Sequence, residues 1–123
     1  MRPVAILLAL LALCHPASSA EKSVVGLWLR EDGLAQVRIG PCGDVLCGFV
    51  AWVKNPEHAG DIGLKVFYDM KADGPGEWKG EAFNPEDRKT YTGKLLVEGE
   101  SLKTSGCVFG GLICKSVNWT RLK

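Results

Sequence analysis

The sequence predicts an all-β domain, an eight-stranded antiparallel up-and-down barrel held by two local disulfides. Three observations support this prediction. Apolar and polar residues alternate with a period of two along a series of short stretches, as in strands. Clusters of Gly, Pro, Asn and Asp separate these stretches at close intervals, and no stretch shows a helical period. Four cysteines bracket two of the turns in pairs.

The first four strands are expected at 23–30, 34–39, 47–53 and 64–70, and the last four at 77–83, 90–97, 101–108 and 113–122. The connections are short, except for the loop at 54–63. Short connections imply that each strand pairs with the next, as in a meander. A meander of this size removes its exposed edges by closing into a barrel, which encloses either packed side chains or one small ligand.

The strand at 47–53 is apolar on both of its faces. Strict alternation places Phe49, Ala51 and Val53 on one face and Val50 and Trp52 on the other. A strand that is apolar on both faces is expected at the centre of a sheet, or under a covered outer face.

The cysteines of the predicted domain are Cys42, Cys47, Cys107 and Cys114. An even number in an exported chain indicates disulfides, and three pairings are open. The pairs Cys42–Cys47 and Cys107–Cys114 are favoured, because strand neighbours that flank a hairpin turn lie about 5.5 Å apart, as a disulfide requires. The alternative is a four-cysteine zinc site, which the C-x4-C and C-x6-C spacings and an oxidising compartment disfavour.

Residues 1–20 are expected to be a cleaved export signal, which leaves 21–123 as a single β-barrel domain. Arg2 provides a positive start, an apolar run follows at 4–13, and Ser18 and Ala20 are small residues at the positions that a signal peptidase reads. The apolar run is too short for a membrane span, which needs roughly 20 residues.

Cys14, at the end of the apolar run, leaves one alternative open. A cysteine at this place can carry a lipid in bacterial envelope proteins. Such sites usually have a small residue before the cysteine, whereas Leu13 stands there in this chain. The expected location is therefore the periplasm or the medium, and lipidation of Cys14 is the less favoured outcome.

The exported chain is close to electrically neutral. Arg2 is the one basic residue of the signal, so 14 of the 15 Lys and Arg residues remain against 14 Asp and Glu residues. This balance argues against nucleic-acid binding and against a polybasic membrane patch, since both need clustered positive charge. We expect no nucleic-acid partner and no membrane span, and the oligomeric state stays open.

Two short motifs resemble those of the lipocalin group. Gly26-Leu27-Trp28 resembles the Gly-x-Trp signature of lipocalins, and Arg121 resembles the arginine that packs across that tryptophan in lipocalins, avidins and fatty-acid-binding proteins. The resemblance implies a lipocalin- or avidin-like barrel in which Trp28 and Arg121 close one end. A guanidinium stacked on an indole ring supplies a cation–π contact for this purpose.

Six motifs across nearly the whole predicted domain resemble a family of small exported bacterial proteins that is a domain of unknown function. They are Gly-Leu-Trp at 26–28, Pro-Cys-Gly-Asp-Val-Leu-Cys-Gly at 41–48, Asp-Gly-Pro-Gly-Glu-Trp at 73–78, Asn-Pro-Glu-Asp-Arg-Lys-Thr-Tyr at 84–91, Gly-Cys-Val-Phe-Gly-Gly-Leu-Ile-Cys at 106–114 and Trp-Thr-Arg at 119–121. The resemblance implies a periplasmic or secreted bacterial protein and carries over no catalytic residues. The loop at 54–63 is short beside those of the family.

Motifs for catalysis or metal binding are weak. His58 is the one histidine after the signal, and it lies in a Pro/Gly loop without a nucleophile motif. A zinc site of three protein ligands is correspondingly hard to assemble. Glu86 and Asp87 are adjacent carboxylates in a turn, which turn capping and solvation explain. We expect no enzymatic activity, no metal and no cofactor.

The aromatic residues, four Trp, two Tyr and four Phe, suggest binding. Some of them fill the interior of a small barrel or line a cavity in it. The candidate ligand-binding residues are Trp52, Phe67, Trp78 and Tyr91. The first hypothesis is a barrel that binds a small apolar or amphipathic ligand in the bacterial envelope.

The alternative hypothesis is a protein–protein interaction module or enzyme inhibitor in the periplasm. It predicts a filled interior and an exposed aromatic patch or hairpin tip, for which 43–44 and 109–110 are the candidates. The two hypotheses therefore differ in whether the apolar surface lies inside or outside the barrel.

Overall fold

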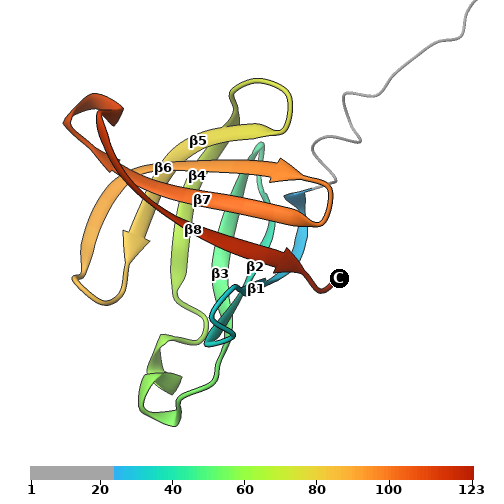
Figure 1. The fold of residues 1–123 in the computed structure, drawn as a ribbon, viewed down its shortest axis with the longest axis vertical. Coiled ribbons are helices and arrows are strands. Elements are labelled where there is room, and N and C mark those ends of the chain that lie inside the picture. The colour runs from blue at the N-terminus through green and yellow to red at the C-terminus, as the bar shows by residue number, and fades with distance from the viewer. Residues whose placement is uncertain (1–23) are drawn as a thin grey trace, which may run out of the picture.

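The strands follow one another around a closed antiparallel barrel, each paired with the next and the last paired with the first (Figure 1). The computed structural model describes residues 24–123. The strands are β1 (Gly26–Arg30), β2 (Ala35–Cys42), β3 (Val45–Val53), β4 (Lys65–Ala72), β5 (Glu77–Asn84), β6 (Lys89–Glu98), β7 (Ser101–Val108) and β8 (Ile113–Arg121). The predicted eight-stranded antiparallel barrel is confirmed. The expected signal and Cys14 lie outside the described residues.

Two short 3-10 helices interrupt the turns. The helix η1 (Pro56–Asp61) lies in the β3–β4 loop, where the Asn55 side chain accepts a hydrogen bond of 2.9 Å from the backbone N–H of Glu57. The helix η2 (Phe109–Gly111) forms the β7–β8 turn. The residue before a 3-10 or α-helix often caps it in this way, because the first N–H groups of a helix have no partner inside it.

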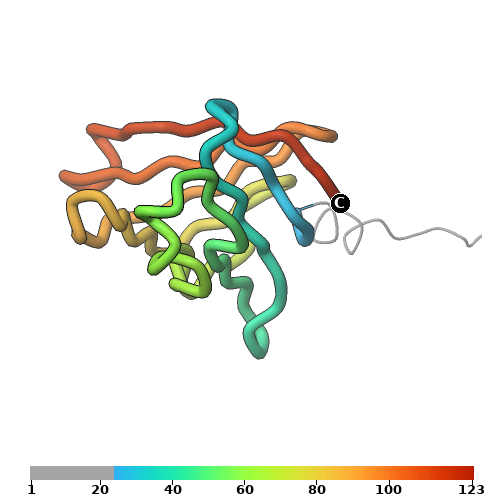
Figure 2. Tube along the Cα trace, turned by 90° about the horizontal axis from the view of Figure 1, so that it is seen from below, coloured from blue at the N-terminus to red at the C-terminus, as the bar shows by residue number. Residues whose placement is uncertain are grey.

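The barrel has two different ends. The β2–β3, β4–β5 and β6–β7 turns lie at one end, together with the C-terminus, and we call this the plugged end. The β1–β2, β3–β4, β5–β6 and β7–β8 connections lie at the other, which we call the tip end. The β7–β8 hairpin projects from the tip end, away from the C-terminus (Figures 1 and 2).

A stack of Trp28 and Arg121 closes the plugged end. The guanidinium carbon of Arg121 lies 4.3 Å from the centroid of the fully buried Trp28 ring. Trp28 Nε1 donates a 2.9 Å hydrogen bond to the carbonyl oxygen of Val24, and Arg121 donates one of 3.3 Å to that of Val25. An ion pair of 3.4 Å with Glu100 holds the other side of the guanidinium. The chain entering β1 is thereby fixed against the barrel.

Both predicted disulfides are confirmed. Cys42–Cys47 joins β2 to β3 across a tight turn, with the Cα atoms 5.7 Å apart. Cys107–Cys114 joins β7 to β8 between directly paired residues, with the Cα atoms 4.1 Å apart. Each bridge therefore fixes the register of one hairpin.

The predicted facing of the strand at 47–53 is wrong at its C-terminal end. Gln36 pairs with Trp52 and Val37 pairs with Val50, so Ala51 is an extra residue that forms a β-bulge. A bulge shifts the alternation by one residue. Trp52 consequently lies outside the barrel, and Val53 packs against the core.

The glycine at position 48 provides space for an aromatic ring. A Cβ atom on Gly48 would lie 2.6 Å from Cδ2 of Phe67, which is too close for any side chain to fit without displacing the ring. By contrast, a Cβ atom added to Gly40, in the paired strand β2, would have no other atom within 4 Å. Strand glycines often mark such close approaches.

We predict that Gly48→Ala lowers the free energy of unfolding by about 1–3 kcal/mol, since overpacking forces Phe67 from its place. The matched control Gly40→Ala is expected to change it by no more than about 0.5 kcal/mol. Urea unfolding with the disulfides intact measures both values. Equal effects of the two substitutions would show that the ring has room to move.

Candidate functional site

The barrel interior is occupied by the chain's own side chains. Phe67 lies against Gly48, and the terminal methyl of Met70 would be 2.8 Å from a Cβ atom on Gly93. These contacts belong to one continuous core of buried residues: Val24, Trp28, Val37, Ile39, Leu46, Val50, Val66, Phe67, Met70, Trp78, Leu95, Val97, Leu102 and Trp119. Since interiors of native density leave few voids larger than a water molecule, this core leaves little room for an enclosed ligand.

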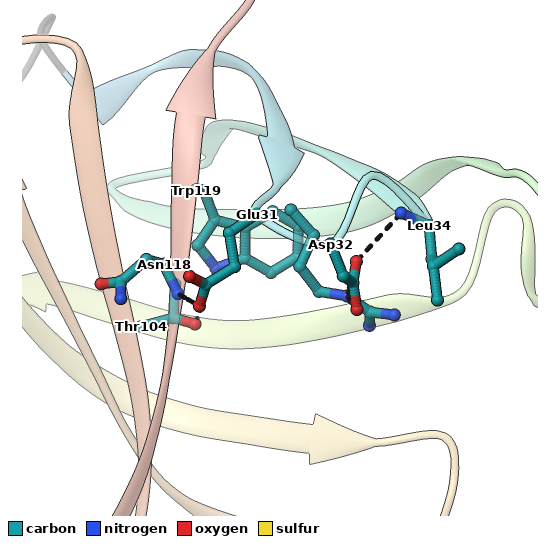
Figure 3. Close-up of polar contacts among 7 residues, drawn as sticks. Glu31, Asp32, Leu34, Thr104, Asn118 and Trp119 are labelled. Atoms are coloured by element: carbon teal, nitrogen blue, oxygen red, sulfur yellow. Dashed lines mark hydrogen bonds and ion pairs between the residues drawn. The ribbon is translucent and has the colours of Figure 1, made fainter.

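The buried polar residue among those described, Thr104, has its partners inside the barrel. Its hydroxyl oxygen accepts a 2.9 Å hydrogen bond from Nε1 of Trp119 (Figure 3). The same hydroxyl donates to the carbonyl oxygen of Val117 at 3.5 Å. A buried polar group that is satisfied in this way is structural, because it has no unpaired atom with which to bind a ligand.

The β1–β2 turn is also fixed by local bonds at the tip end. A carboxylate oxygen of Asp32 accepts the backbone N–H of Leu34 at 2.9 Å, and Glu31 accepts that of Asn118, on β8, at 3.2 Å (Figure 3). The turn therefore lies against the closing strand through Glu31, while Asp32 bonds its near neighbours Arg30 and Leu34.

The four candidate ligand-binding residues do not converge on one site. Phe67 and Trp78 are buried in the core. Trp52 lies on the outer surface with 38% of its area exposed, because of the bulge at Ala51. Tyr91 lies on the inward side of β6 close to the tip end, half-buried. The structure thus separates these residues into core, outer surface and rim.

Tyr91 is held at the rim by Asp87. Its phenol donates a short hydrogen bond to the Asp87 carboxylate, whose other oxygen accepts the backbone N–H of Lys89 at 3.0 Å. The bond from Tyr91 is the main reason that the pKa of Asp87 lies below its ordinary value, and it raises the pKa of Tyr91. Asp87 thereby orients the ring, and both groups stay exposed.

Two further aromatic side chains, Phe49 and Tyr68, lie near each other on the outer face of β3 and β4. The ammonium of Lys65 is 5.7 Å from the ring centroid of Phe49 and 5.1 Å from that of Tyr68. The lysine therefore covers part of both rings, and the group offers less free apolar surface than its aromatic content suggests.

The largest apolar exposure lies at the β7–β8 turn. We call residues 108–113 the apolar tip. Leu112 is 85% exposed, Phe109 75%, Ile113 58% and Val108 37%. These side chains add nothing to the core, and several neighbouring exposed apolar residues are typical of an interaction surface.

The backbone of the apolar tip is unusual at Phe109, which has a φ of 54°. Gly110 and Gly111 follow with φ values of 66° and 94°. A bulky residue in the left-handed region costs roughly 1–3 kcal/mol, and glycine or asparagine would adopt it at lower cost. The fold gains no burial from Phe109 in return, so the position of this ring points to a role outside the fold.

The apolar tip is nevertheless well anchored. The Cys107–Cys114 disulfide lies directly behind it, and the hydroxyls of Ser105 and Ser116 are hydrogen-bonded at 2.8 Å two pairs further back. Within the turn, the backbone N–H of Leu112 donates to the carbonyl oxygen of Phe109 at 3.2 Å. Anchoring of this kind reduces the conformational entropy that is lost on binding.

The sequence indicates part of this site. The hairpin tip at 109–110 is one of the two tips that the interaction hypothesis names, whereas that hypothesis does not include Val108, Leu112 or Ile113. The signal that could have found them is the run Val-Phe-Gly-Gly-Leu-Ile, which has no polar side chain, between the two cysteines of a hairpin. The other tip, at 43–44, carries no exposed large apolar residue.

Residues 24–123 contain no group of three or more His, Cys, Asp or Glu side chains placed to hold a metal ion. His58 lies exposed in η1. Within the same residues, no helix has the length and apolar character needed to cross a membrane.

Comparison with protein-family models matches residues 26–121 to the family described as uncharacterized protein conserved in bacteria (DUF2147). The chain belongs to this family. The match runs from the first residue of β1 to the last residue of β8, so it covers the entire barrel. Neither a curated protein nor a solved structure matches the chain. The lipocalin or avidin likeness therefore stays a prediction.

We predict that Tyr91→Phe raises the pKa of Asp87 toward its ordinary value of 3.8. Loss of the phenol removes the hydrogen bond that favours the carboxylate. Since the folded-state pKa is the lower one, the stabilisation by this bond is present above the unfolded-state pKa and is lost as the pH falls through the folded-state pKa. NMR titration of the Asp87 carboxyl measures the change. The control Tyr68→Phe, on the outer face of β4, should leave it unaltered.

Proposed function

We propose that this member of an uncharacterized bacterial family is a contact module, which binds an apolar or amphipathic partner through the apolar tip. The observation that carries the proposal is the position of Phe109. Its ring is three-quarters exposed, and its backbone has a φ that is costly for a phenylalanine. A disulfide fixes the hairpin that presents it. The fold does not need this ring, and a partner would bury it.

The small-ligand hypothesis has less support. An enclosed ligand would need the space that Phe67, Trp78 and the rest of the core occupy. Moving these side chains aside to admit a ligand would break packing contacts throughout the barrel, because protein interiors are close-packed. A small amphipathic molecule that binds at the apolar tip would still agree with the exposed surface there. A protein partner or an inhibited enzyme would agree with it as well.

The proposed location is the periplasm or the medium, and the proposed action involves no catalysis. Two disulfides in a domain of a bacterial family are consistent with a location outside the cytoplasm, where such bonds persist. Removal of 1–20 as an export signal belongs to the same proposal. Under this proposal the chain acts by binding, with Trp52 and Tyr91 outside the contact.

We predict that a photo-activated cross-linker at Leu112, in cells that export the chain, forms adducts with envelope components. The apolar tip brings this position within contact distance of the partner. Leu34 is the matched control, because it is an exposed leucine in another turn at the same end of the barrel. Adducts at Leu112 that exceed those at Leu34 and that disappear on Phe109→Ser support the proposal. Equal adducts at the two positions would overturn it.

A further inference from the structure

We propose that the partner of the apolar tip is the interface of an anionic phospholipid bilayer, with Phe109 and Leu112 inserted below the headgroups and Lys94 and Lys115 bound to them. This inference rests on the proposed function, of which it names the partner.

The apolar tip has the reach of an interfacial anchor. Phe109 lies two residues beyond the bridged residue Cys107, which corresponds to roughly 7 Å of extended chain. Apolar side chains of peripheral proteins are buried about 5–10 Å into the boundary between headgroups and acyl chains. The tip therefore reaches this boundary while the disulfide and the barrel stay outside it.

The composition of the apolar tip suits a bilayer better than a protein surface. Residues 108–113 have no polar side chain, whereas protein interfaces surround an apolar centre with a polar, hydrogen-bonding rim. The backbone N–H of Leu112 is bonded to the carbonyl oxygen of Phe109, which lowers the cost of taking this turn out of water. Convex shape, absence of polar side chains and internal bonding together favour lipid.

Two lysines form a cationic layer just behind the apolar tip. A Cβ atom on Gly111 would lie 3.8 Å from Nζ of Lys94, so this ammonium is beside the turn. Lys115 follows the bridged Cys114 and is exposed. Neither lysine has an ion-pair partner within 4 Å in the described part of the chain. A basic residue close to an anionic bilayer strengthens binding to it.

The charge of the hairpin differs from that of the barrel as a whole. The part of the β7–β8 hairpin nearest the tip, residues 104–117, contains Lys115 and no acidic residue, although the exported chain is expected to be neutral. Arg121, which is ion-paired with Glu100, and Lys123 lie at the plugged end. A local excess of positive charge beside the tip is attracted to an anionic surface despite a neutral total.

The other turns at the tip end are unsuited to an anionic surface. The β1–β2 turn holds Glu31 and Asp32 and no basic residue, although Asp32 is ion-paired with Arg30. Each of the other two connections is acidic by one charge: Glu57 and Asp61 stand against Lys54 in the β3–β4 loop, and Glu86 and Asp87 against Arg88 in the β5–β6 turn. The β7–β8 turn has no acidic residue and is therefore the connection best suited to contact the headgroups. The barrel is then expected to bind tilted, with its other turns in water.

The test is co-flotation of the purified exported chain, disulfides intact, with phosphatidylglycerol/phosphatidylethanolamine vesicles and with phosphatidylcholine vesicles. We expect binding to the anionic vesicles that weakens as the ionic strength rises. The double variant Phe109→Ser/Leu112→Ser should bind them at least about tenfold more weakly, because two large apolar side chains no longer insert. Lys94→Gln/Lys115→Gln should reduce the preference for anionic vesicles.

Matched controls separate these effects from general changes of surface. Leu34→Ser/Ile62→Ser removes two exposed apolar side chains from other connections at the tip end and should bind like the unaltered chain. Lys71→Gln/Lys79→Gln removes two paired exposed lysines on β4 and β5 and should also have no effect. Circular dichroism checks that all variants keep the barrel.

The outcomes separate the inference from the function on which it rests. Absence of binding to anionic vesicles, equal binding to both kinds of vesicle, or full binding by Phe109→Ser/Leu112→Ser would overturn the lipid inference. If vesicles do not bind while the cross-linker at Leu112 joins a protein, the contact function holds with a protein as partner. If Leu112 forms no more adducts than Leu34 as well, both proposals fail.

Discussion

The pairing of β1 with β8 is the constraint on which the rest of the structure depends. Trp28 pairs with Arg121, Leu29 with Thr120 and Arg30 with Trp119. Without these pairs, the first and last strands would be edges with unpaired N–H and C=O groups. Trp28 and Arg121 are also the two residues of the stack. The pairing that closes the sheet therefore also places the two side chains that close the plugged end.

This closure also explains why the apolar tip projects. The C-terminal half of β8 is held in the seam, where Trp119 is buried against Thr104. The N-terminal half has only β7 as a partner, and the two strands continue past the seam as a hairpin. In this half β8 has no second neighbour, whereas β7 stays paired with β6 as far as Cys107, and the Cys107–Cys114 bridge fixes β8 to β7 there. One pattern of pairing thus produces both the hairpin that carries the apolar tip and the buried core.

Much of the fold follows from the sequence, because local rules determine it. Short turns force neighbouring strands to pair, and cysteines that flank a turn are close enough to be joined. The position of Trp52 could not be predicted, since the extra residue Ala51 has no compositional mark and shifts all that follows it. The exposure of Leu112 and Ile113 depends on how far β8 extends beyond its pairing with β1, which begins at Trp119. The strand register determines this extension. Apolar composition alone does not distinguish a residue in the core from one at an exposed tip.

Native mass spectrometry of the Phe109→Ser/Leu112→Ser variant, purified from the cells that export it with disulfides intact, tests the central claim most directly. If the core leaves no room for a ligand and binding takes place outside the barrel, we expect the mass of the bare chain with both disulfides formed. A small molecule that stays bound in this variant, and that is released on denaturation, would have to lie elsewhere than the tip. That result would contradict the account and restore the barrel as a ligand carrier.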